Sequence, residues 1–268
     1  MINEGFLNPI PRVVAHRGDS KHFPENTIEA FTSAVSMDID VIETDVHLSK
    51  DNVVVIWHDD TLDRNTDGEG RIEDHNLEEL LEYDAGYTFS KDEGKTFPFR
   101  NKGVKLCTLD EVLSKCPKQR FNIDLKTNDL KIVAEFIKVI RKHKAESRVC
   151  CASFHFSNLF AIRIAAPDIL TSLAESEIRP LLIRQKLGIL PRKSLDKRLI
   201  FQVPVSQGST KIISPRFIKM MHKRDAIIMV WTINDRDEMK RLFNMGVDSI
   251  MSDDPATVIE VAEELKLR

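Results

Sequence analysis

The chain has 268 residues, 42% of them hydrophobic and 30% charged, which is ordinary for a globular protein and enough for one large domain. Its 39 basic and 42 acidic residues give a net charge of -3, so it lacks the basic excess of a nucleic-acid-binding protein. We find no signal-peptide pattern, no apolar stretch of membrane-spanning length and, among four cysteines, no Cys-x-x-Cys pair. We therefore expect a cytoplasmic protein with reduced cysteines and no transmembrane segment. The sequence does not indicate its oligomeric state.

Short β-branched runs alternate with longer amphipathic segments, a pattern typical of a parallel α/β fold. Strands are predicted at residues 12–16, 40–47, 52–58, 120–126, 148–154, 169–174, 199–205, 226–233 and 247–252. Helices are predicted at residues 27–36, 108–115, 129–143, 158–165, 215–224 and 235–245, with Thr108 and the pair Asn234-Asp235 as N-caps.

The number of predicted strands is one too many for a (β/α)8 barrel. Only a few residues separate the strands at 40–47 and 52–58, whereas a parallel crossover needs about a dozen. These two strands must therefore form an antiparallel hairpin. Without the hairpin arm eight strands remain, so the predicted fold is an α/β TIM barrel with an antiparallel arm.

The segment at residues 59–105 is polar and rich in turns, and it interrupts the alternation of strands and helices. It contains DGEG at residues 67–70, KDEGK at 91–95 and one predicted short helix at 76–82. We interpret residues 1–268 as a single domain that carries an insertion at residues 59–107 directly after the hairpin.

Carboxylates lie near the ends of two predicted strands, where barrel enzymes carry their active sites. Glu43 and Asp45 are two residues apart, so both point to the same face of their strand. Burying like charges is costly, and a cation relieves that cost. With Asp124 they offer three oxygen ligands for a hard divalent ion, Mg²⁺ or Ca²⁺. Taken alone, an outward-facing pair held by ordinary salt bridges also explains this spacing.

His16 and His58 each end a predicted strand beside polar residues. A lone histidine is more often structural, but two near one metal suit a general acid and a general base. Arg17 has a planar fork that matches phosphate oxygens, and Lys126 adds a point charge. Together these groups suit a bound phosphate, although a strand-end arginine also pairs with carboxylates.

The order of motifs resembles the glycerophosphodiester phosphodiesterase family, within the PLC-like phosphodiesterase superfamily. The matching motifs are AHRG (residues 15–18), PENT (24–27), ETDVHLSKD (43–51), WHDDTLDRNTDGEG (57–70), NIDLK (122–126), CASF (151–154), VWTIN (230–234) and GVDSIMSDDP (246–255). They occur in the family's order over nearly the whole chain.

The resemblance implies metal-dependent hydrolysis of a glycerophosphodiester to sn-glycerol 3-phosphate and an alcohol. It implies His16 and His58 as the acid/base pair; Arg17 and Lys126 on the phosphate; and Glu43, Asp45 and Asp124 as ligands of one divalent cation. We add Asn26 and Trp231 to the substrate-binding residues. We also expect Asn26 to be the N-cap of the first helix, residues 13–15 to form the inner barrel wall, and Gly18 to let the backbone approach the phosphate.

Two positions depart from the family pattern. Asp124 stands where Glu is usual, and its shorter side chain changes how it reaches a metal. Cys107 stands where Pro is frequent, so activity is expected to be sensitive to thiol reagents. A rival interpretation is a lysophospholipase D or a sphingomyelinase D-like enzyme, with Phe89, Phe97 and Phe99 of the insertion lining an apolar groove. A non-catalytic ligand-binding barrel is the least favoured alternative, because both histidines and all three carboxylates are present.

Overall fold

The computed structural model describes residues 5–186, 200–208 and 210–268. The strands are β1 (Val13–His16), β2 (Val41–Leu48), β3 (Val54–Ile56), β4 (Cys107–Thr108), β5 (Arg120–Leu125), β6 (Val149–Ala152), β7 (Leu170–Thr171), β8 (Ile200–Pro204), β9 (Ser206–Gln207), β10 (Thr210–Lys211), β11 (Ile227–Trp231) and β12 (Ser249–Ser252). The α-helices are α1 (Ile28–Ser36), α2 (Leu77–Leu80), α3 (Leu109–Lys115), α4 (Leu130–Lys142), α5 (Phe156–Ala165), α6 (Glu175–Lys186), α7 (Pro215–His222), α8 (Arg236–Asn244) and α9 (Pro255–Glu264); single 3-10 turns lie at Ile72–Asp74 and Glu146–Arg148. No helix in these described ranges is long and apolar enough to cross a membrane.

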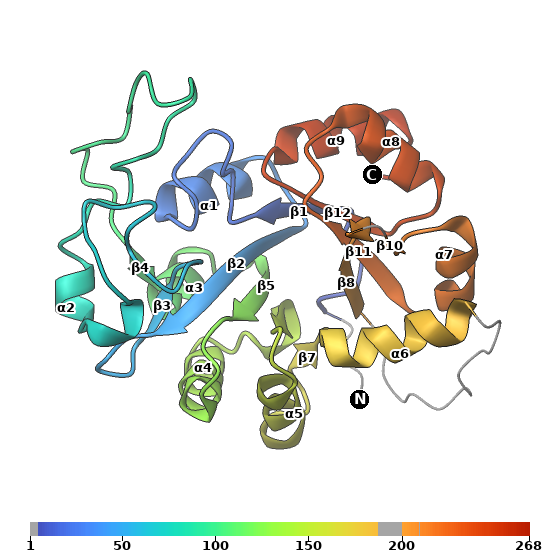
Figure 1. Cartoon of the computed structure of the whole chain (residues 1–268), viewed down its shortest axis with the longest axis horizontal. Coiled ribbons are helices and arrows are strands. Elements are labelled where there is room, and N and C mark those ends of the chain that lie inside the picture. Colours follow the sequence, from blue (N-terminus) through green and yellow to red (C-terminus); the bar gives the residue numbers. More distant parts are fainter. Residues whose placement is uncertain (1–4, 187–199, 209) are drawn as a thin grey trace.

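Eight parallel strands in the described part of the chain form a near-closed barrel (Figure 1). They pair in the order β7, β6, β5, β2, β1, β12, β11, β8. The two end strands meet where the main-chain N–H of Leu173 donates to the carbonyl of Ile200 at 3.1 Å. The predicted α/β TIM-barrel fold is confirmed.

The barrel interior is filled by one hydrophobic cluster, to which most parallel strands contribute one or two side chains. Its buried members are Phe6, Leu7, Val14, Val41, Cys150, Leu170, Ile200, Ile227, Met229 and Met251. Val13 and Ala15 instead join the larger cluster between strands and helices, so only Val14 of residues 13–15 belongs to the inner wall, contrary to expectation. Because strand side chains alternate, His16 and Glu43, each two positions beyond an inward residue, also point inward.

The predicted antiparallel hairpin, which reduced the number of barrel strands to eight, is present. β2 and β3 pair antiparallel, with Val46 opposite Ile56. β3 is shorter than the predicted strand at 52–58, so His58 lies in the loop beyond it rather than at its tip. The N–H of Trp57 donates to the carbonyl of Asp45 at 3.0 Å, which keeps this loop against β2.

The segment between β3 and β4 lies outside the barrel, on the side of the hairpin arm (Figure 1). It includes α2, which corresponds to the short helix predicted at 76–82. It packs around a cluster of its own, whose buried members are Val55, Trp57, Leu62, Ile72, Leu80, Ala85, Val104 and Leu106. The segment therefore has an apolar centre separate from the barrel interior.

The largest differences from prediction lie beyond residue 165. The strand predicted at 169–174 is only the two-residue β7, and α6 and α9 were not predicted. α6 is hard to detect because Pro180 lies inside it and its apolar residues follow no clear helical period. Thr108 is confirmed as an N-cap, and of the pair Asn234-Asp235 the cap is Asp235, since each of these two side chains accepts a main-chain N–H of its helix.

Candidate active site

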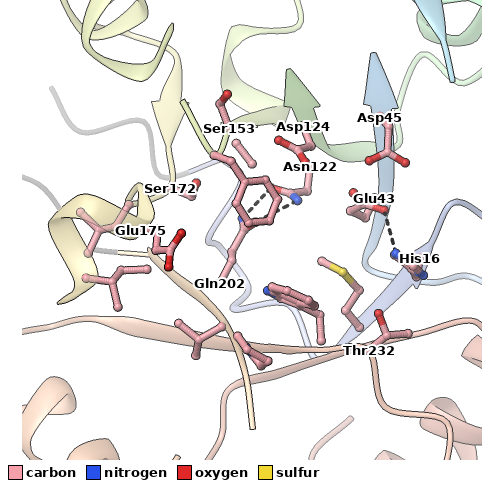
Figure 2. Close-up of a pocket in the computed structure, with 18 of the residues that line it drawn as sticks. His16, Glu43, Asp45, Asn122, Asp124, Ser153, Ser172, Glu175, Gln202 and Thr232 are labelled. Carbon is pink, nitrogen blue, oxygen red and sulfur yellow. Dashed lines mark hydrogen bonds and ion pairs between the residues drawn. The ribbon is translucent and has the colours of Figure 1, made fainter. Parts of the chain in front are cut away.

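A cavity of about 250 Å³ opens at the carboxyl ends of the barrel strands (Figure 2). It has two chemically different ends. The charged end is lined by His16, Arg17, Glu43, Asp45, His58, Asp124 and Lys126. The apolar end is lined mainly by Leu173, Ile178, Leu182, Val203, Ile212 and Trp231, although α6 also contributes Glu175 and Arg179 to the cavity. Figure 2 shows Glu43 and Asp45 on one side of the cavity and Ser172 and Glu175 across from them.

Strand register brings the charged groups together. β1 and β2 align His16 with Glu43, and β2 and β5 align Asp45 with Asp124. Lys126 follows β5 directly, and its main-chain N–H donates to β2. Residues far apart in sequence therefore become neighbours because their strands are adjacent in the barrel.

Asp45 is the centre of the charged end. Lys126 Nζ lies 2.8 Å from Asp45 Oδ1 and 2.7 Å from Asp124 Oδ2. Arg17 Nε lies 3.4 Å from Asp45 Oδ2, and the Asn26 amide donates to the same oxygen at 2.9 Å. Burial alone would raise the pKa of Asp45, but Lys126 and Arg17 outweigh it and lower that pKa. Asp45 is thus held ionised by cations.

Glu43 and Asp124 are less well compensated. Burial, reinforced by the nearby Asp45 carboxylate, raises the pKa of Glu43 to about 8. Burial also raises the pKa of Asp124 despite Lys126, and Asp124 Oδ1 is buried with no hydrogen-bond partner in the described part of the chain. Among residues 5–186, 200–208 and 210–268, no three His, Cys, Asp or Glu side chains are already grouped to hold a metal ion. The donors are nevertheless carboxylate oxygens with unmet demand for positive charge, which suits a hard cation.

His16 is fixed between two carboxylates at the barrel mouth. Its Nδ1 lies 2.6 Å from Asp253 Oδ1, and its Nε2 lies 3.9 Å from Glu43 Oε2. Burial would lower the pKa of His16, but the Asp253 hydrogen bond and the Glu43 charge raise it. Asp253 is itself held by Asn234 at 2.6 Å and Ser20 at 3.2 Å. The ring is therefore oriented by side chains from other parts of the barrel.

His58 also has a carboxylate on Nδ1, but on its own loop. Its Nδ1 lies 2.5 Å from Asp59 Oδ1. Although partial burial opposes ionisation, Arg64 and His58 lower the pKa of Asp59 to about 2. Asp59 is therefore an acceptor at neutral pH, so His58 Nδ1 carries the proton and its Nε2 remains for the cavity.

The apolar end is built mainly from late elements of the chain. Ile178 and Leu182 reach it from α6, and Trp231 reaches it from the end of β11. Phe154 meets Trp231 edge-on, with ring centroids 6.5 Å apart, and is itself 59% exposed. This end offers a solvent-accessible apolar wall directly beside the charged groups.

Comparisons with known proteins show the family of this chain. The model of the "Glycerophosphoryl diester phosphodiesterase family" matches residues 16–257. A "Glycerophosphodiester phosphodiesterase" of Caldanaerobacter subterraneus is 33% identical over 94% of this chain and 98% of its own. The chain belongs to the glycerophosphoryl diester phosphodiesterase family.

Two further relatives carry specific information. An Oleispira antarctica phosphodiesterase, solved in complex with the product sn-glycerol-3-phosphate, has a TM-score of 0.74 and 26% identity over 94% of this chain and 97% of its own. A mouse protein called lysophospholipase D is 26% identical over 92% of this chain and 84% of its own.

Eight of the nine site residues predicted in this family member line the cavity; Asn26 is the exception. Its buried side-chain amide donates a hydrogen bond to Asp45 and accepts one from Thr44 at 2.7 Å. Its prediction as N-cap is wrong: Thr27 caps α1 by accepting from the N–H of Ala30. Asn26 has a left-handed φ of 58°, so it lies in the turn before the helix.

Three other expectations for this family member can be compared with the structure. Gly18 has a φ of 83°, and an added Cβ would lie 2.8 Å from Ala30, so close packing of α1 explains this glycine, and its approach to a phosphate stays a prediction. Cys107 is buried, and burial raises its thiol pKa well above the usual range, which disfavours a reactive thiolate; the sensitivity of activity to thiol reagents stays a prediction. Phe89 and Phe99 pack on each other with centroids 5.3 Å apart, and neither they nor Phe97 line the cavity.

The sequence prediction missed Asp253 and the residues of α6 as parts of the site. Asp253 stands at the end of the last strand in the SDDP motif, which was the available signal. Nothing local indicated that it would meet His16, because the contact depends on β1 and β12 being neighbours in the barrel. Ile178 and Leu182 gave no signal because α6 itself was not recognised.

Proposed function

We propose that this protein hydrolyses glycerophosphodiesters to sn-glycerol 3-phosphate and an alcohol. The observation that carries the proposal is one cavity in which two carboxylate-bound histidines, His16 and His58, lie with the cations Arg17 and Lys126. The family of the chain and the product bound by the Oleispira relative support this substrate class.

The phosphodiester would bind at Arg17 and Lys126, whose positive charge stabilises the additional negative charge of the transition state. Arg17 presents a guanidinium already held by Glu25 at 2.9 Å, so little orientational freedom is lost on binding. Trp231 also lines the cavity and would pack against the substrate. These residues bind and orient the reacting group.

His16 and His58 would transfer the protons. Both have Nδ1 on a carboxylate, which leaves Nε2 of each ring for the substrate. One histidine removes a proton from the nucleophile, which is water or the adjacent glycerol hydroxyl, and the other protonates the departing alcohol oxygen. Phosphorus NMR during turnover distinguishes the two nucleophiles, because attack by the glycerol hydroxyl passes through a cyclic phosphate.

We also propose that Glu43, Asp45 and Asp124 hold one divalent cation, Mg²⁺ or Ca²⁺. The unpartnered Oδ1 of Asp124 and the buried Glu43 carboxylate support this proposal. When bound, the ion would supply Lewis-acid stabilisation of phosphoryl charge. It would compete with Lys126 for the oxygens of Asp45 and Asp124.

The test is an assay of purified protein with glycerophosphocholine and each metal, with sn-glycerol 3-phosphate measured by a coupled enzyme. The proposal predicts equal release of this product and of choline. Release of phosphocholine, which requires cleavage of the other ester bond, or no turnover of a panel of glycerophosphodiesters would contradict it.

A lysophospholipid is a second candidate substrate, favoured by the apolar end of the cavity and by the mouse relative named lysophospholipase D. Leu182 lines that end, whereas the adjacent Ile183 is 61% exposed and does not. Leu182→Gln should raise KM for lysophosphatidylcholine and leave glycerophosphocholine unaffected, with Ile183→Gln as the matched control. Equal effects of Leu182→Gln on both substrates would rule out an acyl chain at this end.

A further inference from the structure

A continuous chain of charged groups runs from His58 to Arg17 outside the cavity. His58 Nδ1 meets Asp59 at 2.5 Å, and Asp59 Oδ2 meets Arg64 Nε at 2.5 Å. Arg64 Nη2 then donates to Glu25 Oε1 at 2.7 Å, and Arg17 Nη1 donates to the same Glu25 oxygen at 2.9 Å. The predicted acid/base group and the predicted phosphate-binding group are thus joined through one arginine.

Arg64 holds both carboxylates with its planar fork. Besides the two bonds above, its Nη2 donates to Asp59 Oδ1 at 3.1 Å and its Nη1 donates to Glu25 Oε2 at 3.2 Å. Each carboxylate therefore receives two bonds from one guanidinium, a geometry that the ammonium of lysine does not reproduce. Arg64 is not among the described residues that line the cavity, so any influence on the reaction passes through its partners.

The need for such a connection follows from where His58 lies. His16 is on a barrel strand, and its partner Asp253 follows the neighbouring strand β12. His58 lies in a loop beyond the three-residue β3, and Asp59 is in the same loop. The orientation of the His58 ring therefore depends on what holds Asp59, and Arg64 makes two of the hydrogen bonds to it.

We propose that Arg64 is a positioning residue: it fixes the orientation of the His58 ring through Asp59 and that of the Arg17 guanidinium through Glu25. This inference rests on the proposed phosphodiesterase function only for its kinetic readout. Exposed ion pairs contribute little to stability, so the loss of Arg64 acts mainly on site geometry. Small misplacements of reacting groups cost far more in rate than the contacts themselves contribute to stability.

The two sides of the connection, Asp59 with His58 and Glu25 with Arg17, should have separable kinetic effects. Asp59→Asn removes the carboxylate next to His58, while Arg64 and Arg17 keep their bonds to Glu25, so it should lower kcat with little change in KM. Glu25→Gln weakens the bonds to Arg17, while Arg64 keeps its two bonds to Asp59, so it should mainly raise KM. Arg64→Met should do both, with kcat lower by about 10- to 100-fold. The double variant Asp59→Asn/Arg64→Met should have the kcat of its slower parent, because both changes act on kcat through His58.

The matched control is Arg71→Met. Arg71 lies in the same insertion, its side chain is 50% exposed against 46% for Arg64, and it pairs with the exposed Glu73 at 2.8 Å. Arg71→Met should leave both kinetic constants unchanged. Arg64→Lys, which keeps the charge and loses the fork, should remain impaired, whereas added methylguanidinium should partly restore Arg64→Met.

A measurement without substrate separates this inference from the proposed function. The imidazole nitrogen NMR signals of His58 should show a proton fixed on Nδ1 in the wild type and mixed tautomers in Arg64→Met. Identical His58 signals in both proteins, or equal kinetic losses in Arg64→Met and Arg71→Met, would overturn the positioning role. An inactive wild type with the expected NMR difference would refute the proposed function and leave the positioning role supported.

Discussion

The two histidines of the candidate site are held by different parts of the molecule. His16 lies on β1, and Asp253, which binds it, follows the adjacent strand β12. His58 lies in the loop after the hairpin arm, and its carboxylate Asp59 is held by Arg64 of the insertion. The two Nδ1–carboxylate contacts are nearly equal in length, at 2.6 and 2.5 Å.

The barrel half of the site, which contains His16, is fixed by strand pairing. The arm half, which contains His58, is fixed by ion pairs with its neighbours. The barrel half depends on main-chain hydrogen bonds between buried strands, which resist local opening. The arm half depends on partly exposed charges, which are individually weak. Changes to the two halves should therefore have different kinetic and pH signatures.

The largest effect is expected from removing either ring. His16→Ala and His58→Ala should each lower kcat by about 10²- to 10⁴-fold, since each removes one proton-transfer group. The measurement is steady-state kinetics on glycerophosphocholine. His222→Ala is the control, because His222 is exposed and also binds a carboxylate, Asp248, at 2.9 Å, yet lies outside the cavity. Near-normal kcat in either site variant would exclude that histidine from catalysis.

Metal removal should affect only the barrel half, since Glu43, Asp45 and Asp124 all lie on barrel strands. Exhaustive EDTA treatment should abolish activity, and Mg²⁺ or Ca²⁺ should restore it. Added metal should also raise Tm, because ligand at one hundred times Kd adds about 2.7 kcal/mol to the free energy of unfolding. Glu43→Gln should abolish that rise in Tm. Full activity after EDTA, or an unchanged rise in Tm in Glu43→Gln, would contradict the metal site.

A smaller effect is expected from removing the carboxylate behind His16. Asp253→Asn should lower kcat by about 10- to 100-fold, because the ring loses the partner that fixes its tautomer. KM should not change, since in the described part of the chain the Asp253 side chain bonds to His16, Ser20 and Asn234 and not to Arg17. Arg64→Met should raise KM as well. The same kcat and KM pattern in both variants would remove the distinction between the two halves.

The sequence predicted the barrel half of the site better than the arm half, and the reason is physical. Two-residue spacing on a strand determines which side chains share a face, so Glu43 and Asp45 could be paired from sequence alone. A short connection between two strands requires an antiparallel hairpin, so the arm was also predictable. Each of these two rules depends on only a few neighbouring residues in the sequence.

The missed features depend on distant segments. Asp253 meets His16 only because the first and last strands pair, and Arg64 meets Glu25 across a sequence separation of 39 residues. The apolar end depends on α6, whose internal Pro180 obscures the helix in the sequence. A closed barrel makes the first and last strands neighbours, but neither this nor a local pattern specifies which side chains meet, so the way each histidine is held could be established only from the structure.

The smallest expected effect is on stability, and it tests whether the arm is held by ionised carboxylates. Arg64 lowers the pKa of Asp59 to about 2 and, with Arg17, lowers that of Glu25, in both cases against partial burial. A carboxylate with a depressed pKa stabilises the fold above its unfolded pKa, and this contribution is lost as pH falls through the folded value. Arg64→Met should therefore lower the free energy of unfolding by about 1 kcal/mol near neutral pH.

That difference should shrink as the pH falls below about 4, where unfolded Asp and Glu take up protons, and should vanish near the folded pKa of Asp59. Urea unfolding of the wild type and Arg64→Met between about pH 7 and about pH 3 measures it. Arg71→Met, whose partner Glu73 is exposed, should show almost no difference at any pH. A penalty in Arg64→Met that stays constant over this range would mean that Arg64 stabilises the arm by packing rather than by charge, and the arm would then resemble the barrel more closely than its ion pairs suggest.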